Sequence, residues 1–418
     1  FILLFVGFSL LVPSFLVQMG NTLSPLLRRF GGVPAYLAAR YVRESGTRTA
    51  VSVGALITAV ALFASLVIMI HSFRRTVEIW TYQTISGDLF LTPKLNEINQ
   101  FRQPIPHQVA AWFQSLDREI EIVPNRRYFL RYDNFPYEFE ALDLDVFLKY
   151  ADFFWMKGKP DKIRSRLRRG EGVIISEVFS NRTGLTVGDT FKARIETSLV
   201  ELPVLGVVRD YRTQGGVVFY SLAHFKMHYH DPRWGGLRVY FRDRNQDLGR
   251  AVSGLRNKII GRWGGDLDMI NGEDLRASIL RVFDETFAVT TVLLLIALVI
   301  AALGIATTLT VLVLERSRQL NTLFAIGASF GQIRSMIFWE AAFMVVAGEL
   351  AGIVCGFILS YLLVYVINRQ SFGWTFLYGV DWGMLGMSLP LIILTALAAA
   401  LPAIKMVFRQ PPATLLRE

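Results

Sequence analysis

One short motif in this chain matches a known catalytic pattern. Residues 327–331 read Gly-Ala-Ser-Phe-Gly, the G-x-S-x-G spacing that presents a nucleophilic serine in many hydrolases. That chemistry needs a strand before the serine and a helix after it, whereas apolar residues at helical spacing precede Ser329. We therefore expect Ser329 to have no nucleophilic role.

Metal chemistry would need several imidazole, thiolate or carboxylate groups that converge on one point. His224 and His228 are four residues apart and would share a helix face, but His230 would then point elsewhere. Cys355 is the only cysteine and lies in an apolar run, so a thiolate site is not expected. We interpret the histidines as surface residues and predict no bound metal, with a histidine metal site as the alternative.

Two carboxylates interrupt the apolar run 336–367. Ionisable groups inside a membrane are costly and often functional. Glu340 lies near one end of the run, where the membrane interface is an alternative position. Glu349 lies deeper, and we expect it to be a polar clamp between helices, with a proton relay as the alternative.

No G-x-x-x-x-G-K-[ST] phosphate-binding loop occurs in the sequence. If ATP drives this protein, a separate subunit must therefore bind ATP and Mg²⁺ and hydrolyse the nucleotide. We expect no enzyme activity in this chain and no cofactor bound by it.

The composition indicates which class of protein contains these residues. The chain of 418 residues is 52% hydrophobic and 19% charged, against about 25% charged in an ordinary soluble domain. Long apolar runs alternate with stretches of soluble composition, which predicts a membrane protein with a soluble insert. The net charge is +10, but many basic residues flank apolar runs instead of forming a stripe with aromatics, so nucleic acid is not an expected partner and membrane lipid is.

Five apolar runs are candidate membrane spans, since about 20 apolar residues cross a bilayer. The first begins at Phe1, inside an apolar run, and we expect it to be truncated and the chain to be part of a longer polypeptide. It has neither the basic start nor the cleavage site of a secretory signal. The predicted spans are 1–19, 50–70, 287–314, 336–367 and 384–404.

Basic residues predict the orientation of these spans, because Lys and Arg accumulate in short cytoplasmic loops. The segments 20–49, 315–335 and 405–418 are rich in arginine, whereas 368–383 has only Arg369. The first three are therefore expected in the cytoplasm, and 368–383 and the large insert 71–286 outside. The aromatic and arginine-rich stretch 32–49 favours a helix at the cytoplasmic interface, with an ordinary loop as the alternative.

The insert has the pattern of an α+β domain. Strands are predicted at 87–93, 172–176, 190–195, 202–209 and 237–242. A short helix at 177–183 should end at Gly184, and helical spacing recurs at 247–262. A further helix should begin at Asn271 and continue into the third span, as a tether or as a force-transmitting rod. The expected fold is an α-helical transmembrane bundle, a four-helix unit plus one preceding helix, with an α+β domain between the second and third spans of that series.

Residues 315–333, ERSRQLNTLFAIGASFGQI, join the third and fourth spans. The segment opens with charges and then places apolar residues at near-helical spacing before a break at Gly327. This pattern fits a short amphipathic helix along the membrane, with a simple re-entry loop as the alternative. The residues that could contact a partner here are Glu315, Arg316, Arg318, Leu320, Leu323, Phe324, Ile326 and Gly327.

Glycines recur every four residues in the fourth span, at Gly348, Gly352 and Gly356. Small residues at this spacing let two helix backbones approach closely. We expect a helix-packing face, with tolerated membrane glycines as the alternative.

The segment ERSRQLNTLFAIGAS resembles the cytoplasmic connection of the FtsX/MacB/LolC-type ABC transporter permeases. Residues 38–62, 172–211 and the tail 408–418 are similar to that family's entry helix, periplasmic core and C-terminal ending, so the resemblance covers roughly residues 32–418. Gln319-Leu320-Asn321 and Phe324 depart from the family's usual Glu-Ile-Gly and Arg. With an extra span before the four-span unit, the chain looks like the second half of a longer two-repeat member.

The resemblance implies a permease subunit in the bacterial inner membrane, without its own ATPase. A cytoplasmic ATPase dimer would push on residues 315–329, and the spans would convey the motion to the periplasmic domain, which acts on a lipoprotein, lipid, peptide or small hydrophobic compound. Expected partners are that ATPase dimer, a second permease repeat or subunit, and a periplasmic accessory protein. The alternatives are an FtsX-like regulator of a periplasmic cell-wall hydrolase, and a membrane-anchored periplasmic enzyme.

Overall fold

The structure is a computed structural model. It describes residues 2–409 except for 45, 97, 117, 196–197, 214, 230 and 246. Some side chains inside helices, including those of Arg318 and of residues 398–409, are also outside the described part. The predictions for His230, for the Arg318 side chain and for the side chains of the tail 405–418 therefore lie outside the described residues.

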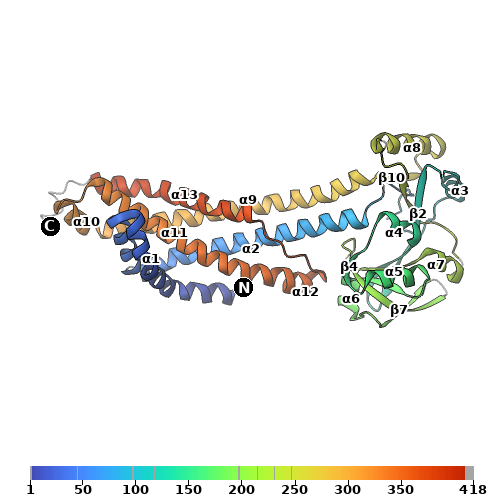
Figure 1. The fold of residues 1–418 in the computed structure, drawn as a ribbon, viewed down its shortest axis with the longest axis horizontal. Helices are drawn as coiled ribbons and strands as arrows, with labels where there is room; N and C mark the ends of the chain where they lie inside the picture. Colours follow the sequence, from blue (N-terminus) through green and yellow to red (C-terminus); the bar gives the residue numbers. More distant parts are fainter. Residues whose placement is uncertain are drawn as a thin grey trace. The chain divides into compact units, whose positions relative to one another are not determined.

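The chain divides into two compact units (Figure 1). The first comprises Phe1–Ser72, Glu285–Val366 and Tyr378–Glu418, and the second comprises Phe73–Asp284 and Ile367–Leu377. The sequence assigned residues 71–286 to the inserted domain and 368–383 to a separate outer loop. Much of that loop, Ile367–Leu377, belongs to the same unit as the inserted domain.

Long apolar helices build the first unit. Among the described residues, four helices are long and apolar enough to cross a membrane: Leu3–Thr22, Thr49–Thr84, Gly272–Glu315 and Phe330–Phe372, and a shorter apolar stretch covers Trp382–Thr395. The elements are α1 (Ile2–Glu44), α2 (Gly46–Thr84), α9 (Gly272–Glu315), α10 (Ser317–Ala325), α11 (Phe330–Tyr361), the π-helix η1 (Leu362–Ile367) and α13 (Trp382–Arg409).

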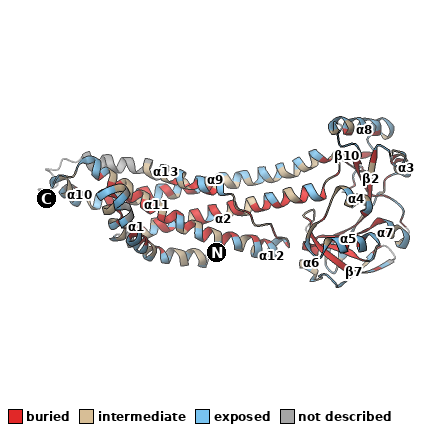
Figure 2. Cartoon of the chain, viewed as in Figure 1, coloured by how far each residue is buried: buried red, intermediate tan, exposed pale blue. Residues whose placement is uncertain are grey.

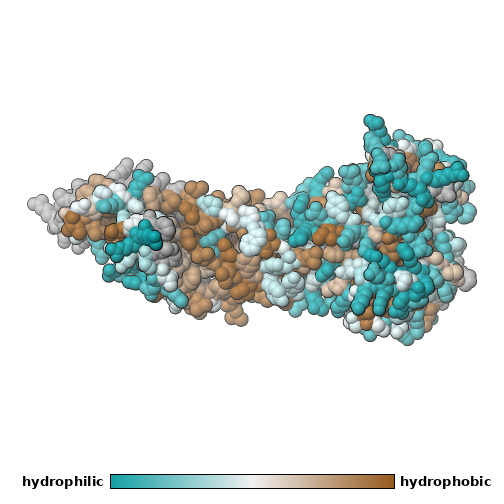
Figure 3. Space-filling view, viewed as in Figure 1, coloured by the Kyte–Doolittle hydropathy of each residue, from teal (hydrophilic) through white to brown (hydrophobic). Residues whose placement is uncertain are grey.

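The bundle packs apolar side chains on its inside and also leaves many on its outside. Buried residues line α2 and α11 (Figure 2), and Leu56, Val60 and Met344 lie in one cluster. On the face shown in Figure 3, hydrophobic residues gather over the middle of the helices, and α9 exposes residues such as Val289 and Ile300. Such an exterior is stable in hydrocarbon and unfavourable in water, as expected of membrane spans.

Helix α1 is broken at Gly32, which has a φ of 67°. Glycine takes this left-handed conformation readily because it has no Cβ atom. After the break, Ala38 and Val42 are completely buried, and Ala38 packs with Val313 of α9 and Ile337 of α11. The segment predicted to be an interfacial helix is therefore helical up to Glu44 and is packed against the ends of the spans.

The second unit is built on a mixed β-sheet with helices, in strand order β10-β1-β9-β2-β3-β8-β5-β7-β4, and β6 pairs with β7. Its strands are β1 (Leu89–Pro93), β2 (Ile120–Tyr132), β3 (Phe135–Leu142), β4 (Phe154–Lys157), β5 (Val173–Ser176), β6 (Thr190–Ile195), β7 (Ser198–Arg209), β8 (Val217–Ser221), β9 (Gly236–Phe241) and β10 (Leu267–Asn271). Its helices are α3 (His107–Ser115), α4 (Leu144–Tyr150), α5 (Pro160–Arg168), α6 (Glu177–Thr183), α7 (Leu222–Tyr229), α8 (Leu248–Trp263) and α12 (Asn368–Phe372).

Most of the predicted elements of the insert are present. Gly184 ends α6 with a φ of 77°, as expected of a left-handed cap. Helix α9 runs without a break from Gly272 into the apolar span, which confirms the predicted continuous helix. The hairpin of β2 and β3 was not predicted. Both of its faces carry buried charged residues, Arg126 on one and Glu140 on the other, and these hide the alternation of apolar and polar residues that identifies a strand.

Candidate functional site

Helix α10 connects α9 to α11, and its two faces differ. Leu320 is buried against Val313 and Met336, while Leu323 and Phe324 are only partly buried against the same cluster. These three residues were predicted to contact a partner protein, but they pack mainly on the chain's own helices. The amphipathic pattern of this segment therefore holds α10 on the bundle.

The exposed apolar residues of this connection lie at its C-terminal end. Gly327 has a φ of 105° and follows the helix, and Ile326 next to it is 77% exposed. Phe330, the first residue of α11, is 56% exposed, and its ring centre is 4.5 Å from that of Phe324. Phe330 was missed by the sequence reasoning, although it lies four residues after Ile326. Ile326, Phe330 and the open side of Phe324 form what we call the apolar tip.

Arg316 has a role different from the one predicted. Its Nη2 atom lies 2.7 and 2.6 Å from the two carboxylate oxygens of Glu340, which is fully buried. Its guanidinium also lies 4.6 Å from the ring centre of Tyr41 in α1. Arg316 thus joins α1, the start of α10 and α11, and it neutralises the charge of Glu340. The neighbouring Glu315 side chain is exposed.

The three glycines of α11 lie against α2. A Cβ atom built on Gly348 would be 2.6 Å from Leu56 Cδ2, and one on Gly352 would be 2.6 Å from Val60 Cβ. A Cβ atom on Gly356 would be 2.7 Å from the Cβ of Ala64. The partner positions 56, 60 and 64 are also four apart, so two helix faces are in register along their length.

Glu349 links α11 to α13. The Ser388 hydroxyl lies 2.5 Å from Glu349 Oε1 and 2.6 Å from the Leu385 carbonyl. Glu349 is 2% exposed, and no cation of the described residues lies within ion-pair distance. This geometry is that of a polar contact between two helices.

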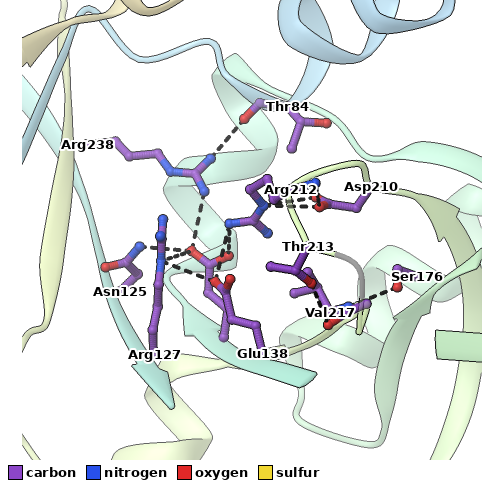
Figure 4. A network of polar contacts seen from close by, with 12 residues as sticks. Thr84, Asn125, Arg127, Glu138, Ser176, Asp210, Arg212, Thr213, Val217 and Arg238 are labelled. Carbon is purple, nitrogen blue, oxygen red and sulfur yellow. Dashed lines mark hydrogen bonds and ion pairs between the residues drawn. The ribbon is translucent and has the colours of Figure 1, made fainter. Parts of the chain in front are cut away.

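A buried polar network lies in the second unit, on β2, β3, β9 and the β7–β8 connection (Figure 4). Glu140 of β3 is fully buried, and Arg212 Nη1 lies 2.8 Å from its Oε2 atom. Arg127 and Arg238 each place a nitrogen 3.4 Å from Glu140 Oε1, and Asn125 Nδ2 donates to the same oxygen at 2.8 Å.

Two further carboxylates complete this network. Glu138 lies 3.5 Å from both Arg127 and Arg212, and Asp210 accepts from Arg212 Nε at 3.1 Å. Burial would raise the pKa of Glu140, but Arg212, Arg127 and Arg238 together hold that pKa well below its usual range. For Glu138, burial outweighs Arg212 and Arg127 and raises the pKa.

The charged network is connected to the end of α2. Arg238 Nη1 donates to the carbonyl of Thr84, the last residue of α2, at 2.9 Å. Arg276 of α9 donates to the Ile85 carbonyl at 2.8 Å, and Arg74 of α2 pairs with Asp284 of α9 at 2.7 Å. Because helix C-termini carry unpaired carbonyls, arginines are suitable partners there. These contacts secure the sheet to both long helices.

Ser329, the serine of the possible nucleophile motif, has a structural role. Ser329 caps α11: its Oγ accepts from Gln332 N at 3.2 Å, and Gln332 Oε1 accepts from Ser329 N at 2.8 Å. A helix precedes Ser329, as expected, so the serine has no strand-to-helix turn. His224 and His228 lie on α7, and no three His, Cys, Asp or Glu side chains in the described part of the chain are grouped to hold a metal.

Comparison with protein families matches residues 291–412, which contain most of α9 and all of α10 and α11, to the C-terminal domain of FtsX-like permeases. The chain carries an FtsX-like permease domain. Over 410 residues, or 95% of its length, the chain is 27% identical to the uncharacterized ABC transporter permease protein Rv0987 of Mycobacterium tuberculosis. It spans 47% of that relative, about half its length. It is also 40% identical over 73 residues, 18% of this chain and 16% of the relative, to the ABC transporter permease YtrF of Bacillus subtilis.

Among solved structures, the periplasmic region of MacB from Actinobacillus actinomycetemcomitans matches 46% of this chain and 91% of its own, at 14% identity and a TM-score of 0.32. The extracellular domain of the transporter YknZ from Gram-positive bacteria matches 44% of this chain and 99% of its own, at 15% identity and a TM-score of 0.30. The FtsX-like permease domain and the long apolar helices together make this a membrane-embedded protein.

Proposed function

We propose that this chain is the membrane subunit of an ABC transporter in the bacterial inner membrane, driven by a separate cytoplasmic ATPase dimer. The FtsX-like domain, the ABC permease relatives and the lack of a phosphate-binding loop in the sequence support this assignment. ATP and Mg²⁺ would bind to the ATPase. The substrate would be a lipoprotein, lipid, peptide or small hydrophobic compound handled outside the membrane, and a second permease repeat and a periplasmic accessory protein would complete the assembly.

The observation that carries this proposal is the apolar tip beside α10. Ile326 and Phe330 are exposed between two candidate spans, while Leu320 fixes the helix to the bundle. The end of α10 and the start of α11 thus present an exposed aliphatic and an exposed aromatic residue that can dock into a groove on a partner protein. Arg316 is engaged with Glu340, so the tip and not Arg316 would provide the contact.

Motion of α10 has a continuous path to the sheet domain. Helix α9 is unbroken from Glu315 to Gly272, and α2 is unbroken from Gly46 to Thr84. Because a helix is stiff along its axis, displacement at one end is transmitted to the other. Arg238 and Arg276 hold the far end of α2 through its terminal carbonyls. This arrangement supports a mechanical transfer of the energy of ATP hydrolysis to the domain.

Replacing Phe330 by alanine should weaken co-purification of the ATPase at least tenfold, since truncation of a buried interface anchor commonly costs about 2 kcal/mol or more. Ile326→Ala should have a smaller effect in the same direction. The measurement is the amount of ATPase retained by the tagged chain from detergent-solubilised membranes. Leu350→Ala serves as the control, because Leu350 is a half-exposed aliphatic residue on the membrane part of α11. Unchanged ATPase binding in both tip variants would refute the docking role.

The orientation of the chain is a second testable part of the proposal. In a Cys355→Ser background, a cysteine at Ser253 on exposed α8 should react with a membrane-impermeant maleimide in intact spheroplasts. A cysteine at the exposed Gln319 of α10 should react only after the membrane is opened. The reason is the excess of arginine in the connections 20–49 and 315–335, since basic residues accumulate in short cytoplasmic loops. Labelling of position 319 from outside would overturn this topology.

A further inference from the structure

The segment Ile367–Leu377, which we call the strap, connects α11 and η1 to α13 but belongs to the compact unit of the sheet domain. It contains the short helix α12 and the irregular residues 373–377. The chain therefore passes between the two units at four points: after Ser72, after Asp284, and before and after the strap. The first two crossings lie in the continuous helices α2 and α9, whereas the strap depends on side-chain contacts.

One buried carboxylate is dedicated to the strap. Glu177, the first residue of α6, has only 3% of its side chain exposed. Its Oε1 accepts from the Thr375 hydroxyl at 2.7 Å, and its Oε2 accepts from the Thr375 backbone N–H at 3.1 Å. The Nε atom of Arg209 lies 3.9 Å from its Oε2 atom. A buried carboxylate is stable only when its oxygens are paired, and here strap residue Thr375 provides both hydrogen bonds.

Further contacts hold the strap at Thr375 and before it. Asn181, one helical turn after Glu177, donates to the Gly373 carbonyl at 2.7 Å and accepts from Arg369 at 3.1 Å. The Tyr211 hydroxyl donates to the Thr375 carbonyl at 3.1 Å. All three polar groups of Thr375, its N–H, its carbonyl and its hydroxyl, are therefore bound by side chains of the sheet domain.

The end of the strap contacts the long helices. Leu377 N donates to the Thr76 hydroxyl of α2 at 2.8 Å. The ring centres of Phe376 and Phe73 are 4.6 Å apart. The ring centre of Phe73 is also 4.7 Å from that of Phe283 in α9. The strap thus binds α6 at one end and the α2–α9 pair at the other. A loop that only connected two spans would need none of these buried contacts.

We propose that the strap is a third mechanical connection, through which movement of α11 and α13 reaches the α6 corner of the sheet, with Glu177 as the positioning residue that holds it. This inference rests on the proposed function, since it assumes that the ATPase moves the spans. Helices α2 and α9 act on the sheet through Arg238, Arg276 and the chain itself, and the strap acts on α6 through Glu177 and Asn181.

The contact between Glu177 and Thr375, which we call the clasp, is tested first, on the full chain in detergent without the ATPase. Glu177→Ala and Thr375→Val should each accelerate amide hydrogen exchange of residues 373–377 at least tenfold, and the double variant should add little to either, because both remove the same contact. Exchange in β5 and β7 should stay unchanged. Glu171→Ala, which removes an exposed glutamate of the same domain, is the control. Unchanged protection of 373–377 in both variants would refute the clasp.

The mechanical role is tested on the complex with the co-purified ATPase. ATP binding should change hydrogen exchange of α6 in the wild-type complex, and Glu177→Ala should remove at least nine-tenths of that change while ATPase co-purification stays normal. An equal ATP response of α6 in wild type and Glu177→Ala would refute the third connection and leave the transporter assignment standing. Absence of any ATP response in wild type would overturn both the connection and the coupling mechanism on which it rests.

Discussion

Gly352→Leu is expected to prevent formation of a stable helical bundle. At this position a Cβ atom alone would lie 2.6 Å from Val60 Cβ and 3.1 Å from the Ile57 carbonyl oxygen of α2. A backbone carbonyl cannot move aside without displacing the helix, so leucine must push α11 away from α2. Overpacking a tight core usually costs about 1–3 kcal/mol, and a whole leucine side chain against a helix backbone should exceed that range. Gel-filtration yield and thermal unfolding in detergent measure the effect.

Gly304→Leu is the matched control for this experiment. Gly304 lies in the apolar part of α9, and a Cβ atom there would meet nothing within 4 Å. The same substitution should therefore leave the yield and the melting temperature near their wild-type values. If Gly352→Leu behaved like Gly304→Leu, the glycine face would not be a close contact between α2 and α11.

Glu140→Ala is expected to destabilise the sheet domain by about 3–5 kcal/mol, the typical penalty for breaking a buried ion pair by removing one partner. The loss is large because Arg127, Arg212 and Arg238 would keep their buried charges with only Glu138 and Asp210 to balance them. Hydrogen exchange of β3 and β8 in the full chain should accelerate accordingly. Glu201→Ala on β7 is the control, since the Lys192–Glu201 pair is solvent-exposed and should contribute at most about 1 kcal/mol.

The effect of Glu140→Ala should depend on pH in a defined direction. The folded-state pKa of Glu140 lies below its unfolded value of about 4.3, so the carboxylate stabilises the fold fully above that value. As the pH falls below that unfolded-state pKa, the Glu140 carboxylate is protonated in the unfolded chain before it is protonated in the folded chain. The contribution of this carboxylate to the free energy of unfolding is therefore lost. The difference between wild type and Glu140→Ala should hence narrow below about pH 4.3. A difference that grew on acidification would contradict the assigned pKa direction. Glu138, whose pKa is raised in the wild-type domain, acts there in the opposite direction.

The sequence alone identified features that depend on local patterns. Uninterrupted apolar runs predicted the long helices, because a helix that faces hydrocarbon needs apolar residues on all sides. The left-handed cap at Gly184 and the unbroken passage of α9 into its span both have signatures within a few residues. The spacing of Gly348, Gly352 and Gly356 predicted a packing face, although it could not identify α2 as the helix facing those glycines.

Only the tertiary structure decided how residues far apart in the chain combine. Arg316 has the same local pattern as a partner-contacting arginine, but Glu340, in the next helix, turns it inward. The β2–β3 hairpin carries buried charges that are tolerable only because β9 and the β7–β8 connection bring Arg238 and Arg212 to them. Likewise, nothing in the sequence around Thr375 or around Glu177 indicates that these two residues contact each other. Burial and pairing depend on long-range contacts, whose partners have no fixed spacing along the chain, so no local pattern could have indicated the strap.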